Sequence, residues 1–258
     1  MLKFNLPLEG NKKLAQVMEN VQKDEELKTL LEMSNVTAVN RMGINDHGSV
    51  HVKIVANSSL LILRTLIKAG IVPSIVKDYK LQNEDAEVVI ILAAILHDSG
   101  HAIHRYRHEV MSTVFTSPII ERLIDGLYKG KEKTIVKFEI LHAIYSHEPS
   151  VVPLTIEGGV MKIADSLDME KGRARVPYRI GSVNIHSLSA MAIEKVEILE
   201  GEERPIKVII HMSDSAGIFQ VDDLLREKMR TSGVGQFFTI EAWLTRNGEE
   251  KLLKKIQI

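Results

Sequence analysis

An apolar run that ends in an adjacent histidine and aspartate is the feature that most constrains this chain. The run extends from Val88 to Leu96, and His97 and Asp98 follow it directly. Such a run is long enough to form part of a buried helix, and a buried carboxylate without a partner is strongly unfavourable. A divalent metal is one suitable partner, because imidazole nitrogen and carboxylate oxygen together bind it well. Three further histidines follow within eleven residues: His101, His104 and His108.

Composition excludes several classes of protein. The chain has 258 residues, of which 45% are hydrophobic and 26% are charged, so it can bury a full core. Its net charge of −1 gives no broad electrostatic footprint for polymeric nucleic acid or an anionic membrane. It contains no cysteine, which excludes disulfides and thiolate metal sites. There is no signal pattern and no uncharged run near the ~20 residues of a membrane span. We therefore expect a cytoplasmic protein that does not contact a membrane.

The sequence predicts helices over the first two thirds of the chain. Apolar residues recur at helical spacing, and Gly or Pro follows several of these segments. One segment, Thr134 to His147, carries two histidines that lie about 140° apart around a helix axis; His147 shares a stripe with apolar residues, so we prefer it to His142. Gly70 to Asn83 is expected to be a connection. The predicted helices cover 11–33, 36–41, 50–69, 83 to the His97-Asp98 pair, 108–115, a segment from 117, 134–147 and 160–169.

The periodicity changes near residue 181. Four segments alternate like strands, a helix lies between the second and the third, and Asn247-Gly248 predicts a hairpin turn. The fold class is therefore mainly α: an all-helical domain over 1–180 and a small α+β domain over 181–258. The second domain carries no chemistry that we can recognise, and oligomerisation, a lid and ligand sensing all suit it. The predicted strands are 193–199, 206–212, 237–245 and 252–258, and the predicted helix is 220–229.

The histidines are dispersed as they would be in a folded site. Eight of the ten lie between positions 47 and 147, beside apolar helices and not in one tract. Any single one of them is more simply a structural core residue, so the joint pattern carries the argument. Five places on predicted helices present His or Asp to an apolar interior: His51, His97-Asp98, His108, His147 and Asp165.

The order of these residues resembles the HD superfamily of metal-dependent phosphohydrolases. Four stretches, about residues 40 to 170, carry the resemblance: His51 to Val55, Leu96 to Gly100, Ala143 to His147 and Lys162 to Asp168. The resemblance implies that His51, His97, Asp98 and Asp165 bind a divalent metal. An alternative for Asp165 is a capping or salt-bridged acid, and Asp168 is expected to be a solvated or outer neighbour.

Two-metal members of this superfamily place further ligands where His108 and His147 stand. The resemblance therefore implies one or two divalent ions, with Asp98 bridging them if there are two. Mn, Fe, Mg, Ni, Co and Zn all suit such a site. The alternative is that His108 and His147 donate hydrogen bonds to substrate.

The stretch from His97 to His101 also resembles the deoxynucleotide triphosphohydrolase branch, although the spacing to the next histidine differs and the chain is short for that branch. The resemblance makes Asp98, His101 and His104 candidate catalytic residues; His101 and His104 would act as acid or base, or alternatively contact a substrate phosphate. Guanidinium groups suit phosphate geometry, and Arg105, Arg173 and Arg175 follow proposed ligands. His47, four residues before His51, is expected to cap a helix or to lie just outside the ligands.

The resemblance to the HD superfamily implies a metal-dependent phosphohydrolase. It would cleave a phosphoester or phosphoanhydride of a nucleotide or similar small phosphorylated molecule, with water activated by the metal. Two alternatives stay open: a nucleotide-sensing regulatory protein with little turnover, and a di-iron oxygenase. Exposed sheet edges can pair across chains, so a homodimer is expected.

Overall fold

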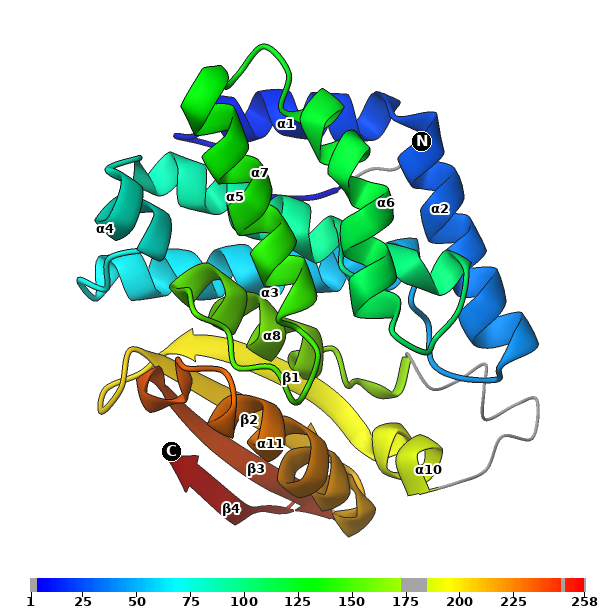
Figure 1. Cartoon of the computed structure of the whole chain (residues 1–258). Helices are drawn as coiled ribbons and strands as arrows, with labels where there is room; N and C mark the ends of the chain where they lie inside the picture. The colour runs from blue at the N-terminus through cyan, green and yellow to red at the C-terminus, as the bar shows by residue number, and fades with distance from the viewer. Residues whose placement is uncertain (1–3, 173–184, 247–248, 258) are drawn as a thin grey trace.

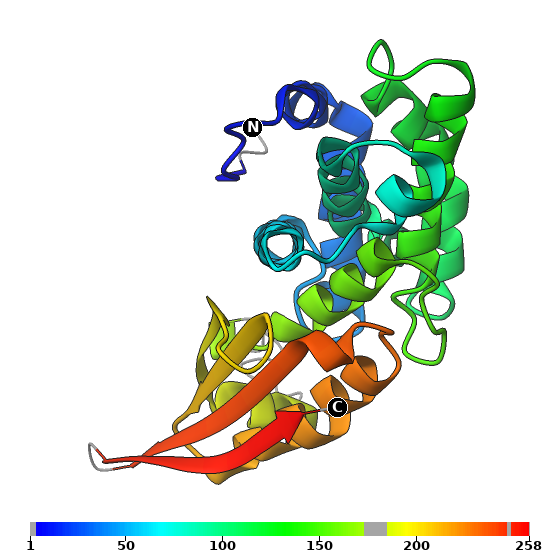
Figure 2. The same cartoon turned by 90° about the vertical axis from the view of Figure 1, so that its left-hand side faces the viewer.

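The computed structural model describes residues 4–172, 185–246 and 249–257. A layer of helices stands on a small four-stranded sheet, and α8 (Ile156–Leu167) lies where the two layers meet (Figure 1). Figure 2 shows the same two layers from the side, with the sheet below the helices. The expected fold class, a helical region followed by a small α+β region, is confirmed.

The amino-terminal helices form where the sequence predicts helix, with one break. Residues 11–33 were expected to form a single helix, but the structure has α1 (Lys12–Lys23) and α2 (Glu25–Asn35). The break arises because the Asp24 carboxylate accepts a hydrogen bond from the amide of Leu27 (2.8 Å) and so caps a new helix. The short segment η1 (Val36–Arg41), a π-helix, follows.

The central helices form the core of this layer. The helix α3 (Ser49–Lys68) is long and apolar enough to cross a membrane, but half of that stretch is buried inside the molecule. The helix α5 (Asn83–Leu96) has every residue from Asp85 to Leu96 buried, which agrees with its continuous apolar run. The segment expected to be a plain connection contains a short helix, α4 (Ser74–Tyr79), which begins directly after Pro73.

A proline lies inside the next helix. We expected separate helices before and after Ser117, but α6 runs unbroken from His108 to Leu123 with Pro118 within it. The buried residues Ile119 and Ile120 follow the proline, and burying them offsets the one backbone hydrogen bond that proline removes. The short 3-10 helix η2 (Ser99–Ala102) precedes α6, and α7 (Gly130–Tyr145) follows it and ends before His147.

The sheet has the strand order β1-β2-β3-β4. Two antiparallel pairs, β1 (Ile193–Glu200) with β2 (Ile206–Met212) and β3 (Phe238–Arg246) with β4 (Glu249–Gln257), are joined by parallel pairing of β2 with β3. The crossover between β2 and β3 contains η3 (Ser215–Gly217), η4 (Gln220–Leu225), α11 (Arg226–Arg230) and η5 (Gly235–Phe237). The helix α10 (Ile185–Met191) precedes β1. The predicted hairpin turn at 247–248 lies outside the described residues.

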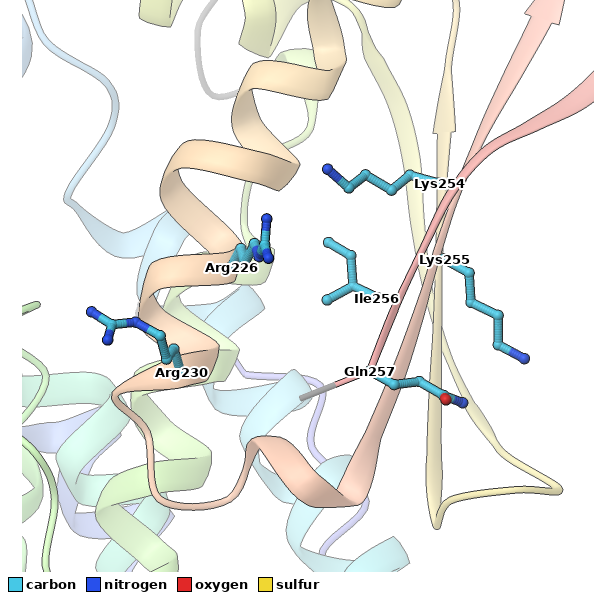
Figure 3. Close-up of a pocket in the computed structure, with 6 residues that line it drawn as sticks. All are labelled: Arg226, Arg230, Lys254, Lys255, Ile256 and Gln257. Atoms are coloured by element: carbon cyan, nitrogen blue, oxygen red, sulfur yellow. The ribbon is translucent and has the colours of Figure 1, made fainter.

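One buried apolar cluster includes residues of both layers, from Leu14 in α1 to Ile256 in β4. Contacts between α3 and both β1 and β2 join the layers, and Lys68 and Glu200 form an ion pair between them (2.6 Å). A groove of about 300 Å³ lies between α11 and β4, with Lys254 and Ile256 pointing from β4 toward the helix (Figure 3).

Candidate metal centre

The start of α3 places His51 in the interior. The Asp46 carboxylate accepts hydrogen bonds from the amides of Gly48 (3.1 Å) and His51 (3.3 Å), so it satisfies amide groups at the beginning of the helix. His51 is fully buried. A polar side chain is thereby fixed on the first turn of a core helix, with its ring directed inward.

The His97-Asp98 pair lies where α5 ends and the chain turns sharply. The Ser112 hydroxyl of α6 donates to the carbonyl of His97 (2.5 Å) and accepts from the amide of Gly100 (2.9 Å). A Cβ atom at Gly100 would lie 2.1 Å from the carbonyl oxygen of His108. Only glycine permits this approach, and the approach brings the first turn of α6 against Asp98.

A buried lysine holds the segment after His147. The Lys162 ammonium, on α8, donates to the carbonyls of Glu148 (3.0 Å), Pro149 (2.9 Å) and Val151 (2.7 Å). Its three donors match these three acceptors. The chain that leaves α7 is therefore fixed to α8, which keeps His147 beside the other histidines.

Four side chains, from the helices α3 and α8 and from the end of α5, converge on one point. The Nε2 atoms of His51 and His97 lie 3.2 Å apart. The Asp98 Oδ2 atom is 3.3 Å from the first and 3.2 Å from the second. The Asp165 Oδ1 atom, from α8, is 3.3 Å from His51 Nε2 and 3.7 Å from His97 Nε2. We call these four residues the first group; they present two imidazole nitrogens and two carboxylate oxygens.

The other oxygen of Asp98 faces a second group, formed with His108 and His147. Its Oδ1 atom lies 3.2 Å from His108 Nε2 and 3.8 Å from His147 Nε2, and these two nitrogens are 3.1 Å apart. The Asp98 carboxylate is thus divided between two sets of donors. Each group has the donor chemistry that divalent metals accept.

The hydrogen bonds of the histidines fix which nitrogen faces inward. The Nδ1 atom of His51 lies 2.6 Å from Asp168 Oδ2, and a carboxylate only accepts, so this nitrogen carries the proton. In the same way the Nδ1–H groups of His97, His108 and His147 donate to the carbonyls of Ala94, Arg105 and Ile144. Their Nε2 lone pairs are left for a metal, as in known metal sites.

The electrostatics also suit metal binding. Burial opposes ionisation of Asp98, but the neighbouring imidazoles of His97 and His47 hold its pKa well below the usual range. Burial depresses the pKa of His147 well below its ordinary value. An ionised carboxylate beside a neutral imidazole is the protonation state in which both bind metal.

Comparison with known proteins identifies the family. The profile of the HD domain matches residues 49–170, the part of the chain that supplies every residue of the two groups. MJ1020, an uncharacterized protein of Methanocaldococcus jannaschii, is 42% identical over 242 residues, which are 94% of this chain and 93% of that protein. The chain belongs to the HD domain family. No solved structure matches it. HD domains are typical of metal-dependent phosphohydrolases, and the His and Asp groups of this one are able to bind a metal ion.

Two more histidines extend the centre of this HD domain. His47, Asp98 and His101 form a further set of donors, and the rings of His47 and His101 lie 4.4 Å apart. The sequence placed His47 only at the edge of the site. Its Nδ1–H donates to the carbonyl of Asn45 (2.5 Å), so it has the same tautomer as the other donors.

His101 differs from these donors. Its Nε2 atom lies 3.0 Å from Arg105 Nη1 and 3.6 Å from Asp98 Oδ1. Its Nδ1 atom is buried and has no hydrogen-bond partner among the described residues. Burial lowers the pKa of His101 to about 3, so the ring is neutral and accepts from the Arg105 guanidinium. Arg105 therefore lies against the edge of the centre.

The structure does not bring every expected residue together. His104 is exposed, and its Nδ1 atom accepts from the amide of Tyr106 (2.9 Å) within its own loop. Arg173 and Arg175 lie outside the described residues.

Two residues hold proposed ligands from outside, and sequence reasoning missed one of them, Lys228. Asp168 was expected to be either solvated or an outer neighbour of the ligands, and its buried contact with His51 Nδ1 agrees with the second alternative. Lys228, on α11, pairs with Asp165 Oδ2. Its only signal in the sequence was a position in a predicted helix, 63 residues after Asp165.

Proposed function

We propose that this HD protein is a metal-dependent phosphohydrolase that cleaves a phosphoester or phosphoanhydride of a nucleotide or similar small phosphorylated molecule. The observation that carries the proposal is the division of the Asp98 carboxylate between two groups of donors. A carboxylate so divided would bridge two ions in a dinuclear centre of the kind that phosphoryl-transfer enzymes use.

The residues of the two groups have distinct tasks in this proposal. His51, His97, Asp98 and Asp165 would hold one ion, and Asp98, His108 and His147 would hold the other. Bound divalent ions would lower the pKa of a water molecule and stabilise negative charge on the phosphoryl group. The fixed tautomers and the burial of the ligands mean that the donors need no rearrangement before they bind.

Arg105 and His101 would serve the substrate. The exposed Arg105 side chain contacts His101 at the edge of the centre, and this contact supports the proposal that its guanidinium binds a substrate phosphate. A phosphate there would add negative charge and favour the protonated imidazole. His101 could protonate the leaving oxygen only in that protonated state, which the bound phosphate would have to induce because the ring is neutral in the free protein. His104 stays a proposed catalytic residue, although its exposed ring is held within its own loop.

Other parts of the proposal concern the setting of the reaction. The balanced charge of the chain favours a small phosphorylated substrate over polymeric nucleic acid. The cytoplasm stays the proposed location. Arg173 and Arg175 stay proposed phosphate contacts. A homodimer through the open edges of the sheet, β1 and β4, also stays a prediction, which sedimentation analysis would test.

Metal analysis of freshly purified protein, followed by a nucleotide panel, tests the proposal. The panel is read as released phosphate, pyrophosphate or triphosphate, for the wild type, Asp98→Ala and the surface control Asp223→Asn. We expect about two ions per chain and turnover that Asp98→Ala abolishes and Asp223→Asn retains.

Other outcomes would contradict parts of the proposal. One ion with turnover would demote His108 and His147 to substrate contacts. Metal without phosphate release would favour a nucleotide sensor, and bound iron with substrate-dependent oxygen consumption would favour an oxygenase. An absence of metal under several loading conditions would reject the site.

A further inference from the structure

The α+β region supplies a side chain to the metal centre. Lys228 lies on α11, in the crossover between β2 and β3, and its ammonium pairs with the Oδ2 atom of Asp165. The other oxygen of Asp165, Oδ1, faces His51 and His97. The side chains of Asp165 and Lys228 are only 10% and 19% exposed, so this pair is largely shielded from water.

We propose that Lys228 is a positioning residue that holds Asp165 with Oδ1 toward the first group, and that the α+β region is thereby part of the HD metal centre. The inference rests on the proposed function, because it assumes that the first group binds metal. A carboxylate that binds metal through one oxygen usually has its other oxygen held by a hydrogen bond, which fixes its orientation. Lys228 provides that bond here.

The surroundings of α11 make this lysine a fixed part of the centre. The Thr231 hydroxyl, next to α11, donates to the carbonyl of Pro149 (3.1 Å), in the segment that Lys162 also holds. A Cβ atom at Gly159 of α8 would lie 2.5 Å from the carbonyl oxygen of Ser232, so the two backbones are in close contact. The helix that carries Lys228 is thus attached to the helix that carries Asp165.

Charge supports the same assignment. The Lys228 ammonium lies against Oδ2 of Asp165 in a largely buried setting, so it balances the negative charge of that carboxylate. An ammonium beside a metal site also repels the incoming ion. We expect positioning to outweigh this repulsion, because the ammonium pairs with the oxygen that faces away from the imidazole nitrogens.

A calorimetric titration of the full chain with Mn²⁺ alone tests the inference without substrate. Three variants are compared with the wild type: Lys228→Met, which removes the charge and keeps the length; Lys228→Arg, which restores a donor; and Arg226→Met, a control on the same helix. Arg226 lines the groove toward β4 (Figure 3). We expect Mn²⁺ affinity to fall roughly 10- to 100-fold in Lys228→Met, to recover in Lys228→Arg and to be unchanged in Arg226→Met.

An affinity in Lys228→Met that is unchanged, or higher than that of the wild type, would overturn the inference. Circular dichroism excludes loss of the fold as the cause of a fall. If Lys228→Met does not fold, Lys228→Gln and Lys228→Arg are compared instead. We then expect Lys228→Arg to bind Mn²⁺ as the wild type does and Lys228→Gln to bind it more weakly. A wild type that binds Mn²⁺ but releases no phosphate from any nucleotide would reject the proposed function and leave the role of Lys228 in metal binding standing.

Discussion

Single hydrogen bonds decide which atom each histidine offers. Asp168 holds the proton of His51 on Nδ1, and backbone carbonyls do the same for His97, His108 and His147. The acceptor of the His51 bond is a side chain, so a substitution can remove it. Its acceptor is buried and lies outside the four residues that form the first group.

Replacing Asp168 with Asn is expected to weaken metal binding without unfolding the protein. The amide is a poorer acceptor, and its NH₂ group can face Nδ1 and favour the wrong tautomer, so affinity for Mn²⁺ should fall roughly 10- to 100-fold. Titration calorimetry measures the fall, and Asp223→Asn, at an exposed position, is the matched control. Equal affinities in the wild type and Asp168→Asn would contradict the role given to this bond.

The stability of the protein should also depend on pH through His142. Its Nε2 atom accepts from the amide of Leu154 (3.1 Å), and burial lowers its pKa below the ordinary 6.5. The folded state therefore binds fewer protons than the unfolded state in mildly acidic solution, so this contribution is present above pH 6.5 and is lost as the pH falls.

The expected result is a free energy of unfolding that falls less steeply in His142→Gln than in the wild type between about pH 7 and pH 5. Glutamine keeps an acceptor for the amide of Leu154 but does not titrate. Urea unfolding at a series of pH values measures both slopes. Identical slopes would show that the protonation of His142 does not affect folding.

At the scale of elements, the position of His147 depends on a contact between α8 and the segment after α7. Lys162 satisfies three carbonyls there and is fully buried. A methionine would fill the space but would leave the carbonyls without a donor. The contact therefore contributes to stability and to the geometry of the second group.

We expect Lys162→Met to lower the free energy of unfolding by about 3 kcal/mol, because buried carbonyls lose their hydrogen bonds. Urea unfolding measures the change. The control is Lys195→Met, on β1, whose ion pair with Glu197 is largely exposed and should contribute little. Similar stabilities for the two variants would refute the importance of the buried ammonium.

Sequence periodicity predicted most elements, and for a clear reason. In α5, in the first turn of α3 and in β2, the buried residues recur at the spacing of a helix or a strand. Such spacing can be recognised directly in the sequence. The break at Asp24 was missed because it depends on one side-chain cap within a segment that has neither Gly nor Pro. The unbroken α6 was missed because tertiary packing outweighs the local effect of Pro118.

The centre was predictable only in part for the same reason. His51, His97, Asp98, His108, His147 and Asp165 stand out because polar residues interrupt apolar stripes, and the structure brings all six together. Lys228 does not interrupt an apolar stripe, and its pairing with Asp165 depends on how the two layers pack. His47 lies before its helix, where no stripe exists to mark it.

At the scale of the whole molecule, the two layers share one core. Buried residues of α5, α8, β2 and β3 belong to a single cluster. The Gly159 backbone approaches Ser232 so closely that a methyl group would meet the Ser232 carbonyl oxygen at 2.5 Å. The layers are therefore expected to unfold together.

Replacing Gly159 with Ala should destabilise the protein by about 2 kcal/mol, because the added carbon forces two packed backbones apart. Unfolding should remain a single transition in near- and far-ultraviolet circular dichroism. The control is Gly172→Ala, where a Cβ would meet nothing within 4 Å and little change is expected. Two separate transitions in the wild type would show that the layers fold independently.

The side chains of the centre are spread along the sequence from His47 to Lys228. The ribosome therefore synthesises them at different times. A ribosome releases the helices that carry the ligands well before it releases α11. Until then Asp165 has no ammonium beside it, and a nascent chain holds an incomplete set of contacts. In the cell, therefore, the geometry of the centre is completed only after the crossover of the sheet has been made.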